Sequence, residues 1–204
     1  MKFEFNAGTV LVVDDDPSTL RGLARLLRAS SYVVWAYSSA LELLSRALPE
    51  GAACVLLDLR MPVMDGLQLQ EALCRLGRSW PIVFMSGDPD VPATIQALKA
   101  GAVDFLLKPF EEAQLLTAIG EAMDKSNRVH AFLQEQRHAR ALFAALTRRE
   151  SEVAHLVARG LLNKQIAWEL RTCEKTIKVH RGRAMRKLQV TSVADLVRLA
   201  GYAL

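Results

Sequence analysis

Polar groups suited to phosphate chemistry follow apolar segments in the first half of the chain. Neighbouring carboxylates raise one another's pKa unless a cation neutralises them. A hard divalent cation, Mg²⁺ or Mn²⁺, suits such a site, held by carboxylates, a backbone carbonyl and waters. One carboxylate could then attack a phosphoryl group, while the cation, an ammonium and a hydroxyl share the phosphoryl oxygens. The candidate residues are Asp14, Asp15 and Asp16 after one apolar segment, and Asp58, Ser86 and Lys108 after three others.

Each of these residues also has an ordinary structural explanation. Acidic residues before a helix often cap its amino end, and Asp16 before Pro17 suits that position. Lys108 before Pro109 is typical of a turn. The combination is what indicates a site, because all the groups would lie at the same end of successive strands.

Five short apolar segments, alternating with amphipathic helical segments, would position these groups. Apolar runs without a polar alternation are typical of strands buried on both faces. Strands that alternate with helices predict a parallel sheet covered on both sides, with functional residues at the carboxyl ends of its strands. A last helix near residues 111–123 would close this unit. The five expected strands are residues 10–13, 32–35, 54–57, 82–85 and 103–106.

The rest of the chain is compatible only with helices. Residues 125–141 are polar and helix-favouring, which predicts a helical linker. Thr147 with Glu150 three residues later predicts a capping box, and Gly160 predicts a helix end. Further helices are expected at residues 163–170, 174–188 and 192–200.

The two halves carry opposite net charge. Residues 1–124 hold 10 Lys and Arg against 16 Asp and Glu, whereas residues 125–204 hold 16 against 6. The basic half therefore suits a polyanion, and composition leaves nucleic acid, a membrane surface and an acidic protein open.

Composition also favours a globular cytoplasmic protein with no membrane partner. Hydrophobic residues make up 51% of the chain, yet no apolar run is long enough to span a membrane and no signal peptide is evident. Cys54, Cys74 and Cys173 lack metal-ligand spacing, which argues against structural zinc and disulfides and fits a reducing compartment.

One helix in the basic half has an apolar stripe and a basic face. Ile177, His180, Ala184 and Leu188 form the stripe, in which we expect His180 to be packed and hydrogen-bonded. Short helices around a tight turn at residues 171–173 indicate a helix-turn-helix, and a basic face suits the major groove. The alternative is a solvated charged face. The residues opposite the stripe are Lys175, Lys178, Val179, Gly182, Arg183 and Arg186.

Residues 12–17, 57–66, 85–87 and 101–110 together resemble a two-component receiver domain, a flavodoxin-like (βα)5 doubly wound fold. The resemblance implies that Asp58 is the phosphoacceptor and that Lys108 pairs with the phosphoryl group. It further implies a cis peptide before Pro109. The implied metal ligands are Asp14, Asp15, Asp58 and the backbone carbonyl of Arg60, and the implied switch residues are Ser86 and Phe105.

Residues 146–153, 160–167, 175–181 and 186–188 resemble a LuxR-type helix-turn-helix, a small all-α domain. The implied groove-facing residues are Lys178, Val179 and Gly182, and the implied DNA-backbone contacts are Asn163, Lys164, Thr176 and Lys187. Two positions depart from the family pattern. Gly182 has no side chain, so base reading would fall to Lys178 and Arg186, and Cys173 stands where a serine usually caps the recognition helix, unless Thr172 substitutes.

Together these resemblances identify the chain as a FixJ-like member of the NarL/FixJ response regulators. They imply a receiver domain at residues 1–124, a helical linker at 125–141 and a DNA-binding domain at 142–204. A sensor histidine kinase would phosphorylate Asp58, which would promote homodimerisation and binding to double-stranded DNA. RNA polymerase is a further candidate partner, and the FixJ-like branch favours activation of transcription.

Such a protein accepts and slowly loses one phosphoryl group and is not an enzyme. Two rivals remain: a metal-dependent phosphohydrolase with a basic docking module, and a constitutive DNA-binding protein with a degenerate receiver.

Overall fold

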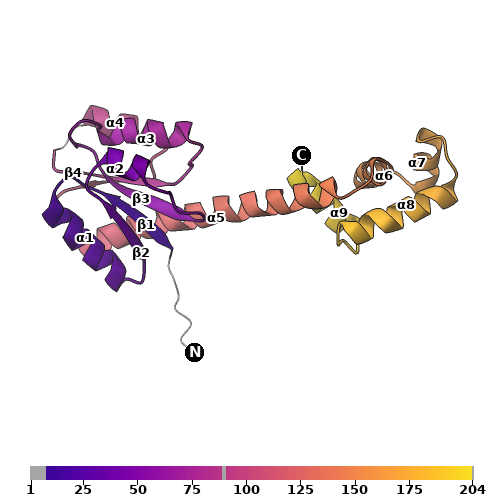
Figure 1. Ribbon diagram of the computed structural model, residues 1–204, viewed down its shortest axis with the longest axis horizontal. Helices are drawn as coiled ribbons and strands as arrows, with labels where there is room; N and C mark the ends of the chain where they lie inside the picture. The colour runs from indigo at the N-terminus through magenta and orange to yellow at the C-terminus, as the bar shows by residue number, and fades with distance from the viewer. Residues whose placement is uncertain (1–7, 89–90, 204) are drawn as a thin grey trace. The chain divides into compact units, whose positions relative to one another are not determined.

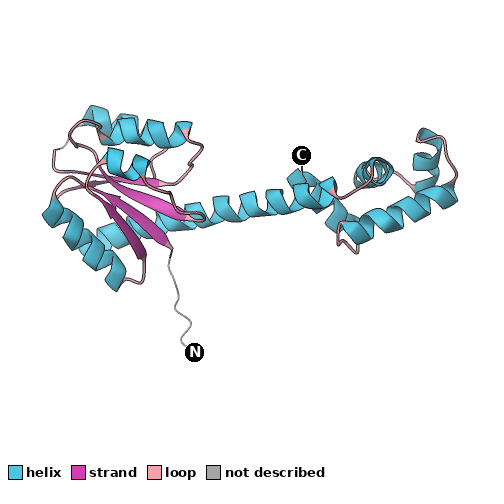
Figure 2. Ribbon diagram, viewed as in Figure 1, coloured by secondary structure: helices cyan, strands magenta, loops and turns pink. Residues whose placement is uncertain are grey.

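The computed structural model describes residues 8–88 and 91–203 and divides into two compact units, Met1–His130 and Ala131–Leu204. Figure 1 labels the helices and the strands β1 to β4, and Figure 2 distinguishes the first unit, which has a sheet between helices, from the helical second unit. The division between His130 and Ala131 falls within residues 125–141, the segment expected to be the linker.

The first unit is built on a five-stranded parallel sheet with the strand order β2-β1-β3-β4-β5. This is the order of the flavodoxin-like doubly wound fold, so the predicted fold class is confirmed. The strands are β1 (Thr9–Val13), β2 (Val33–Tyr37), β3 (Ala53–Asp58), β4 (Ile82–Ser86) and β5 (Asp104–Leu107).

Helices cover both faces of this sheet because its strands are apolar on both sides. Val10 and Val12 of β1 join a buried cluster with the helices α1 and α5, whereas Leu11 and Val13 join a second cluster beneath α2, α3 and α4. Alternate strand residues point to opposite faces, so each strand supplies both clusters. The helices are α1 (Pro17–Ala29), α2 (Ala40–Ser45), α3 (Gly66–Arg75), α4 (Val91–Lys99) and α5 (Glu112–Ala144).

Helix α5 is longer than the sequence analysis predicted. A helix ending near residue 123 and a separate helical linker were expected, but one uninterrupted helix covers residues 112–144. Residues 124–127 are polar but contain no proline or glycine, so nothing in the backbone chemistry ends the helix there.

The second unit is helical throughout its described residues. Thr147 and Glu150 form the predicted capping box at the start of α6, and Gly160 adopts a φ of +87° just beyond the end of that helix. Val153, Ile166, Ile177 and Leu196 come from four different helices and form the centre of its core. The helices are α6 (Arg148–Ala158), α7 (Asn163–Glu169), α8 (Glu174–Lys187) and α9 (Val193–Ala203).

None of the helices in the described residues is long and apolar enough to cross a membrane.

Candidate functional site

The acidic residues meet where the order of the sheet strands reverses. Strands β1 and β3 are direct neighbours, and Val13 pairs with Leu57, so Asp14 and Asp58 occupy adjacent positions at the carboxyl edge. Ligands of open α/β sheets bind at such a reversal point. Both aspartates are buried, with 1% and 6% of their surfaces exposed, respectively.

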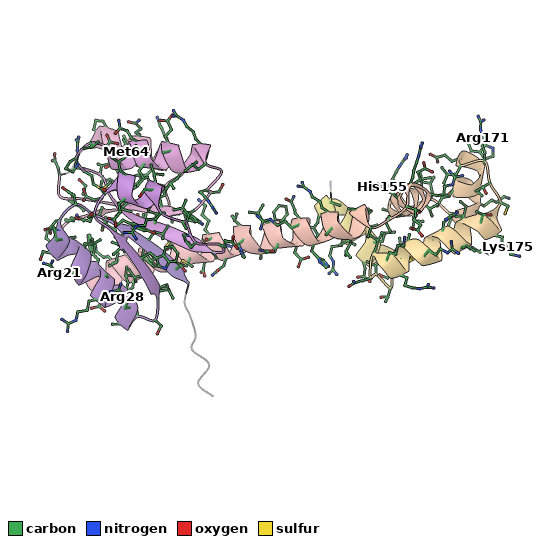
Figure 3. The ribbon with its side chains drawn as sticks, in the orientation of Figure 1. Arg21, Arg28, Met64, His155, Arg171 and Lys175 are labelled. Carbon is green, nitrogen blue, oxygen red and sulfur yellow. The ribbon has the colours of Figure 1, made fainter. Side chains whose placement is uncertain are left out.

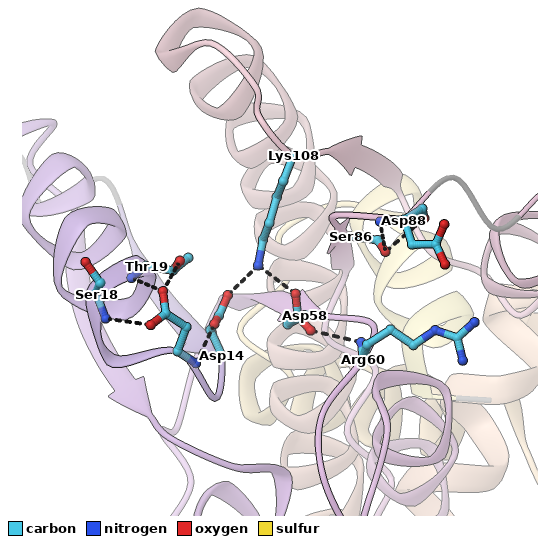
Figure 4. Close-up of polar contacts among 9 residues, drawn as sticks. Asp14, Ser18, Thr19, Asp58, Arg60, Ser86, Asp88 and Lys108 are labelled. Carbon is cyan, nitrogen blue, oxygen red and sulfur yellow. Dashed lines mark hydrogen bonds and ion pairs between the residues drawn. The ribbon is translucent and has the colours of Figure 1, made fainter.

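Lys108 joins the two carboxylates (Figure 4). Its Nζ lies 2.7 Å from Asp14 Oδ2 and 2.6 Å from Asp58 Oδ1. The other oxygen of Asp58 accepts a hydrogen bond of 2.9 Å from the backbone N–H of Arg60. Lys108 precedes the cis peptide bond to Pro109, as the resemblance implied. The predicted acid–lysine combination is therefore brought together by three separate strands.

Burial and charge pull the pKa values of this group in different directions. Burial raises the pKa of Asp58, and the nearby Asp14 carboxylate adds to this effect, while the bonds from Lys108 and Arg60 oppose it. Burial also acts against the charged form of Lys108, but its hydrogen bonds to Asp14 and Asp58 raise the pKa of Lys108. The lysine is thus held as a cation where a phosphoryl group would develop negative charge.

The three consecutive aspartates have different environments. Asp14 faces Lys108, and Asp15 is exposed. Asp16 caps helix α1, because its carboxylate accepts bonds from the backbone N–H groups of Ser18 and Thr19. The hydrogen bond from the Thr19 hydroxyl, followed by these backbone bonds, lowers the pKa of Asp16. The structural explanation considered for Asp16 therefore holds.

The donors at this edge fit a hard divalent cation. Among the described residues, no three His, Cys, Asp or Glu side chains form a cluster that could hold a metal. Mg²⁺ does not need one, because it is commonly bound by one or two carboxylates and keeps several waters. Asp14 and Asp58 supply two buried carboxylates, which share the Lys108 ammonium in this structure. That donor set suits Mg²⁺ or Mn²⁺.

The two proposed switch residues lie on adjacent strands. Ser86 ends β4 and is buried, and its hydroxyl donates to the carbonyl of Asp88 and accepts from the N–H of Asp88, at 3.1 and 3.2 Å. In this conformation the hydroxyl is engaged within its own loop (Figure 4). Phe105 of β5 is half-buried and packs against the cluster beneath α2, α3 and α4.

Helix α8 has the predicted division into a packed face and a basic face. Ile177, Ala184 and Leu188 are buried in the second unit's core. Figure 3 labels Lys175 at the amino end of this helix, directed outward. The exposed residues of the other face are Lys175, Lys178, Val179, Gly182, Arg183 and Arg186.

Three of the four expected DNA-backbone contacts already have partners within the second unit. Asn163 accepts a bond of 3.0 Å from Arg181, and the hydroxyl of Thr176 lies 3.1 Å from Cys173 Sγ. Lys187 pairs with Glu150. Lys164 is exposed near the start of α7.

Two expectations for α8 have definite outcomes. His180 Nδ1 is buried without a hydrogen-bond partner among the described residues, so the prediction of a hydrogen-bonded histidine is wrong at this atom. Cys173 occupies the N-cap position of α8 and makes no side-chain capping bond. Thr172 does not substitute for it as the cap. The helix therefore starts with a weak cap.

Two family models match the two halves of the chain. Residues 10–120 match the response regulator receiver domain, and residues 144–200 match the luxR family of bacterial regulatory proteins. The chain belongs to the NarL/FixJ family of two-component response regulators. A response regulator of this kind is a transcription regulator and not an enzyme, which removes the phosphohydrolase alternative. The receiver domain implies a histidine kinase partner, and the luxR-type domain implies DNA binding.

Relatives match this response regulator over nearly its whole length. Nodulation protein W of Bradyrhizobium diazoefficiens is 41% identical over 191 residues, which cover 94% of this chain and 84% of that protein. Response regulator protein TodT of Pseudomonas putida is 41% identical over 193 residues, covering 95% and 85%. Transcriptional regulatory protein FixJ of Azorhizobium caulinodans is 34% identical over 191 residues, covering 94% and 90%.

Solved structures agree with this assignment. The response regulator StyR has a TM-score of 0.86 and 45% identity, over 95% of this chain and 98% of that one. Full-length FixJ from B. japonicum has a TM-score of 0.59 and 35% identity, over 97% and 98%.

Proposed function

We propose that a sensor histidine kinase phosphorylates Asp58 and that this controls homodimerisation and sequence-specific binding to double-stranded DNA, with activation of transcription as the outcome. The observation that carries the proposal is the buried Asp58 carboxylate held by Lys108 beside Asp14. The same proposal makes the cytoplasm the site of action and RNA polymerase a partner at the promoter.

In the transfer step, an Asp58 oxygen forms a bond to phosphorus while the P–N bond of the kinase phosphohistidine breaks. The histidine takes up a proton and leaves as neutral imidazole. Lys108 pairs with the phosphoryl oxygens, and the Arg60 N–H orients the second oxygen of Asp58. Asp14, Asp15, Asp58 and the Arg60 carbonyl would hold Mg²⁺ or Mn²⁺, which supplies positive charge to the phosphoryl oxygens when it is bound.

The switch step uses Ser86 and Phe105. A phosphoryl group on Asp58 offers the Ser86 hydroxyl a charged acceptor, which is a stronger partner than the neutral backbone of Asp88. Movement of Ser86 leaves room for Phe105 on the neighbouring strand to turn inward. The two states differ in which of these contacts they make, so phosphorylation shifts their populations.

The face that changes is made by α4, β5 and α5, and it supports dimerisation. Ile95 and Leu98 of α4 and Leu107 of β5 are large apolar side chains that are each close to half exposed. Helix α4 packs beside β5, so these side chains belong to one surface. Burying them against a second copy is favourable in proportion to the apolar area removed from water.

The exposed face of α8 is the proposed DNA-reading surface. Lys178, Val179 and Gly182 would enter the major groove, with Arg186 contributing to base reading, and Lys175 and Arg183 beside them. Asn163, Lys164 and Thr176 would contact the phosphate backbone. Lys187 has three N–H donors and uses two on Glu150 and Ala145, so one is left for a phosphate. A dimer would place two such helices on a two-fold-related site.

The phosphorylation step is tested by the intact mass of the protein after incubation with acetyl phosphate and Mg²⁺, beside the variant Asp58→Asn. We expect one added phosphoryl group on the wild type alone. No adduct on the wild type, together with no binding of the mimic beryllofluoride, would contradict the proposal.

The DNA step is tested by the affinity of the phosphorylated chain for its operator at several salt concentrations. Lys178→Ala should weaken specific binding by about 1–3 kcal/mol, and affinity should fall steeply with salt. Asp58→Asn should abolish the gain caused by acetyl phosphate. A flat salt dependence would point away from DNA, and an Asp58→Asn variant that bound like the phosphorylated wild type would favour constitutive binding.

A further inference from the structure

A buried serine of α5 serves the backbone of a distant strand. Ser126 is 4% exposed, and its hydroxyl accepts a bond of 3.0 Å from the N–H of Ala53 and donates a bond of 2.8 Å to the carbonyl of Ala53. Serine within a helix ordinarily points to solvent or bonds a carbonyl one turn back. Ser126 instead joins two segments 73 residues apart in sequence.

The backbone of Ala53 bonds to Ser126 because the neighbouring strand β4 does not extend far enough to pair with it. Alternate residues of a strand direct their backbone groups to the same side. The N–H of Val55 donates to Pro81 on the β4 side, so Ala53 faces that side too. Strand β4 starts at Ile82, opposite Val55, and leaves no strand residue beside Ala53. The Ser126 hydroxyl therefore extends the hydrogen-bond ladder by one residue.

The same stretch of α5 packs on the start of β1. Met123 is buried, and a side chain on Gly8, which precedes β1, would come within 2.1 Å of Met123 Cε. Helix α5 thus closes over the amino ends of β1 and β3. These are the two strands whose carboxyl ends hold Asp14 and Asp58. Both contacts lie beyond residue 120, where the match to the receiver model ends.

We propose that Ser126 is a positioning residue that fixes the departing helix α5 to the receiver sheet, so that the state of Asp58 reaches the DNA-binding half through a helix held at its exit. The bonded pair, the Ser126 hydroxyl with the backbone of Ala53, is called the Ser126 anchor below. The role of this anchor rests on the proposed phosphorylation switch. Without the anchor, the buried N–H and carbonyl of Ala53 have no partner, and this stretch of α5 is held less firmly to the sheet and transmits less of the change.

The test uses the full chain with Ser126→Ala and, as a matched control, Thr117→Ala. Thr117 lies on the same helix and bonds only the carbonyl one turn back, at 2.8 Å. Three quantities are measured: the acetyl phosphate adduct by intact mass, amide hydrogen exchange of residues 121–130, and the ratio of affinities with and without acetyl phosphate. The affinities are measured for one DNA duplex, which the phosphorylated wild type selects from a random-sequence library and which serves as the operator. Ser126→Ala should leave the adduct unchanged, speed exchange at least about tenfold and lower the ratio at least about threefold. Thr117→Ala should change none of the three.

Each outcome decides between the anchor and the switch. If the wild-type ratio exceeds one and Ser126→Ala has the same ratio, the anchor proposal fails while the switch stands. If the wild-type ratio is one, the phosphorylation switch is contradicted, and the anchor then has no signal to transmit. Should Ser126→Ala not fold, Ser126→Cys takes its place, because a thiol is a weaker donor and acceptor of similar size. Ser126→Thr, which keeps the hydroxyl, should restore the wild-type ratio; a ratio as low as that of Ser126→Ala would overturn the role of the hydroxyl.

Discussion

Lys187, the last residue of α8, lies with its ammonium 2.6 Å from the buried carboxylate of Glu150 near the start of α6. The same Glu150 oxygen accepts a bond from the backbone N–H of Thr147. Glu150 therefore completes the cap of α6 and holds the end of the recognition helix. The orientation of α8 in its domain depends on this pair as well as on apolar packing.

The stability of the second unit should fall in acid because of Glu150. The bond from Lys187, followed by the bond from Thr147, lowers the pKa of Glu150 from 4.5 to about 2. A carboxyl whose folded pKa is depressed stabilises the fold above its unfolded pKa and loses that contribution as pH falls through the folded value. Unfolding followed by hydrogen exchange in α6 and α8 should show the loss between about pH 5 and pH 2. Glu150→Gln should be less stable at pH 7 and should show a flatter pH dependence; an unchanged slope would contradict the assignment.

Removing the Lys108 cation should destabilise the receiver in a pH-dependent way. Lys108→Met leaves Asp14 and Asp58 buried without a counter-charge, which we expect to cost about 2–3 kcal/mol at pH 7, allowing for the partial exposure of the lysine. Burial already raises the pKa of Asp58 in the folded state, and loss of Lys108 removes the interaction that opposes this rise, so the variant should regain stability as pH is lowered from 7 to 5. Thermal unfolding of both proteins at the two pH values measures this. A deficit that did not shrink at pH 5 would show that lost packing dominates.

Gly182 should accept a methyl group without steric cost. Nothing lies within 4 Å of a Cβ added there, and the residue is exposed within α8. Gly182→Ala should stabilise the second unit by about 0.5–1 kcal/mol, because glycine is unfavourable inside a helix. It should also change the ranking of operator variants, since the methyl would enter the groove.

Gly201→Ala is the matched control for this substitution, because Gly201 also lies in a helix with open space around it. It should stabilise the unit similarly and leave the operator ranking unchanged. Urea unfolding and competition binding measure the two effects. Identical rankings for both variants would remove Gly182 from the reading surface.

The three thiols should react at different rates. Cys54 is fully buried, and burial raises the pKa of its thiol to about 12. Cys74 and Cys173 are exposed, and the bond to the Thr176 hydroxyl lowers the pKa of Cys173. Because the thiolate is the reactive form, iodoacetamide at pH 8 should label Cys173 first, Cys74 second and Cys54 only after unfolding. Peptide mapping over time checks this order, and rapid labelling of Cys54 in the folded protein would contradict it.

The order of the elements and the position of the acid–lysine group could be predicted from the sequence. Short apolar runs without alternation are typical of strands buried on both faces, and the fold brings the carboxyl ends of such strands together. Asp58 directly follows one of these runs and Lys108 lies two residues after another, so their meeting depends only on the strands being correctly identified. The capping box at Thr147 was equally accessible, because its partners are three residues apart.

Tertiary structure alone decided which polar residues have partners in distant segments of the chain. Lys187 was paired with Glu150, 37 residues away, and Lys108 was placed between Asp14 and Asp58. The bond of Ser126 to Ala53 depends on where β4 begins beside β3. Hydrophobic period is a local property that a sequence records directly. A buried hydrogen bond needs two groups brought together from distant segments, and only the folded chain determines which groups those are.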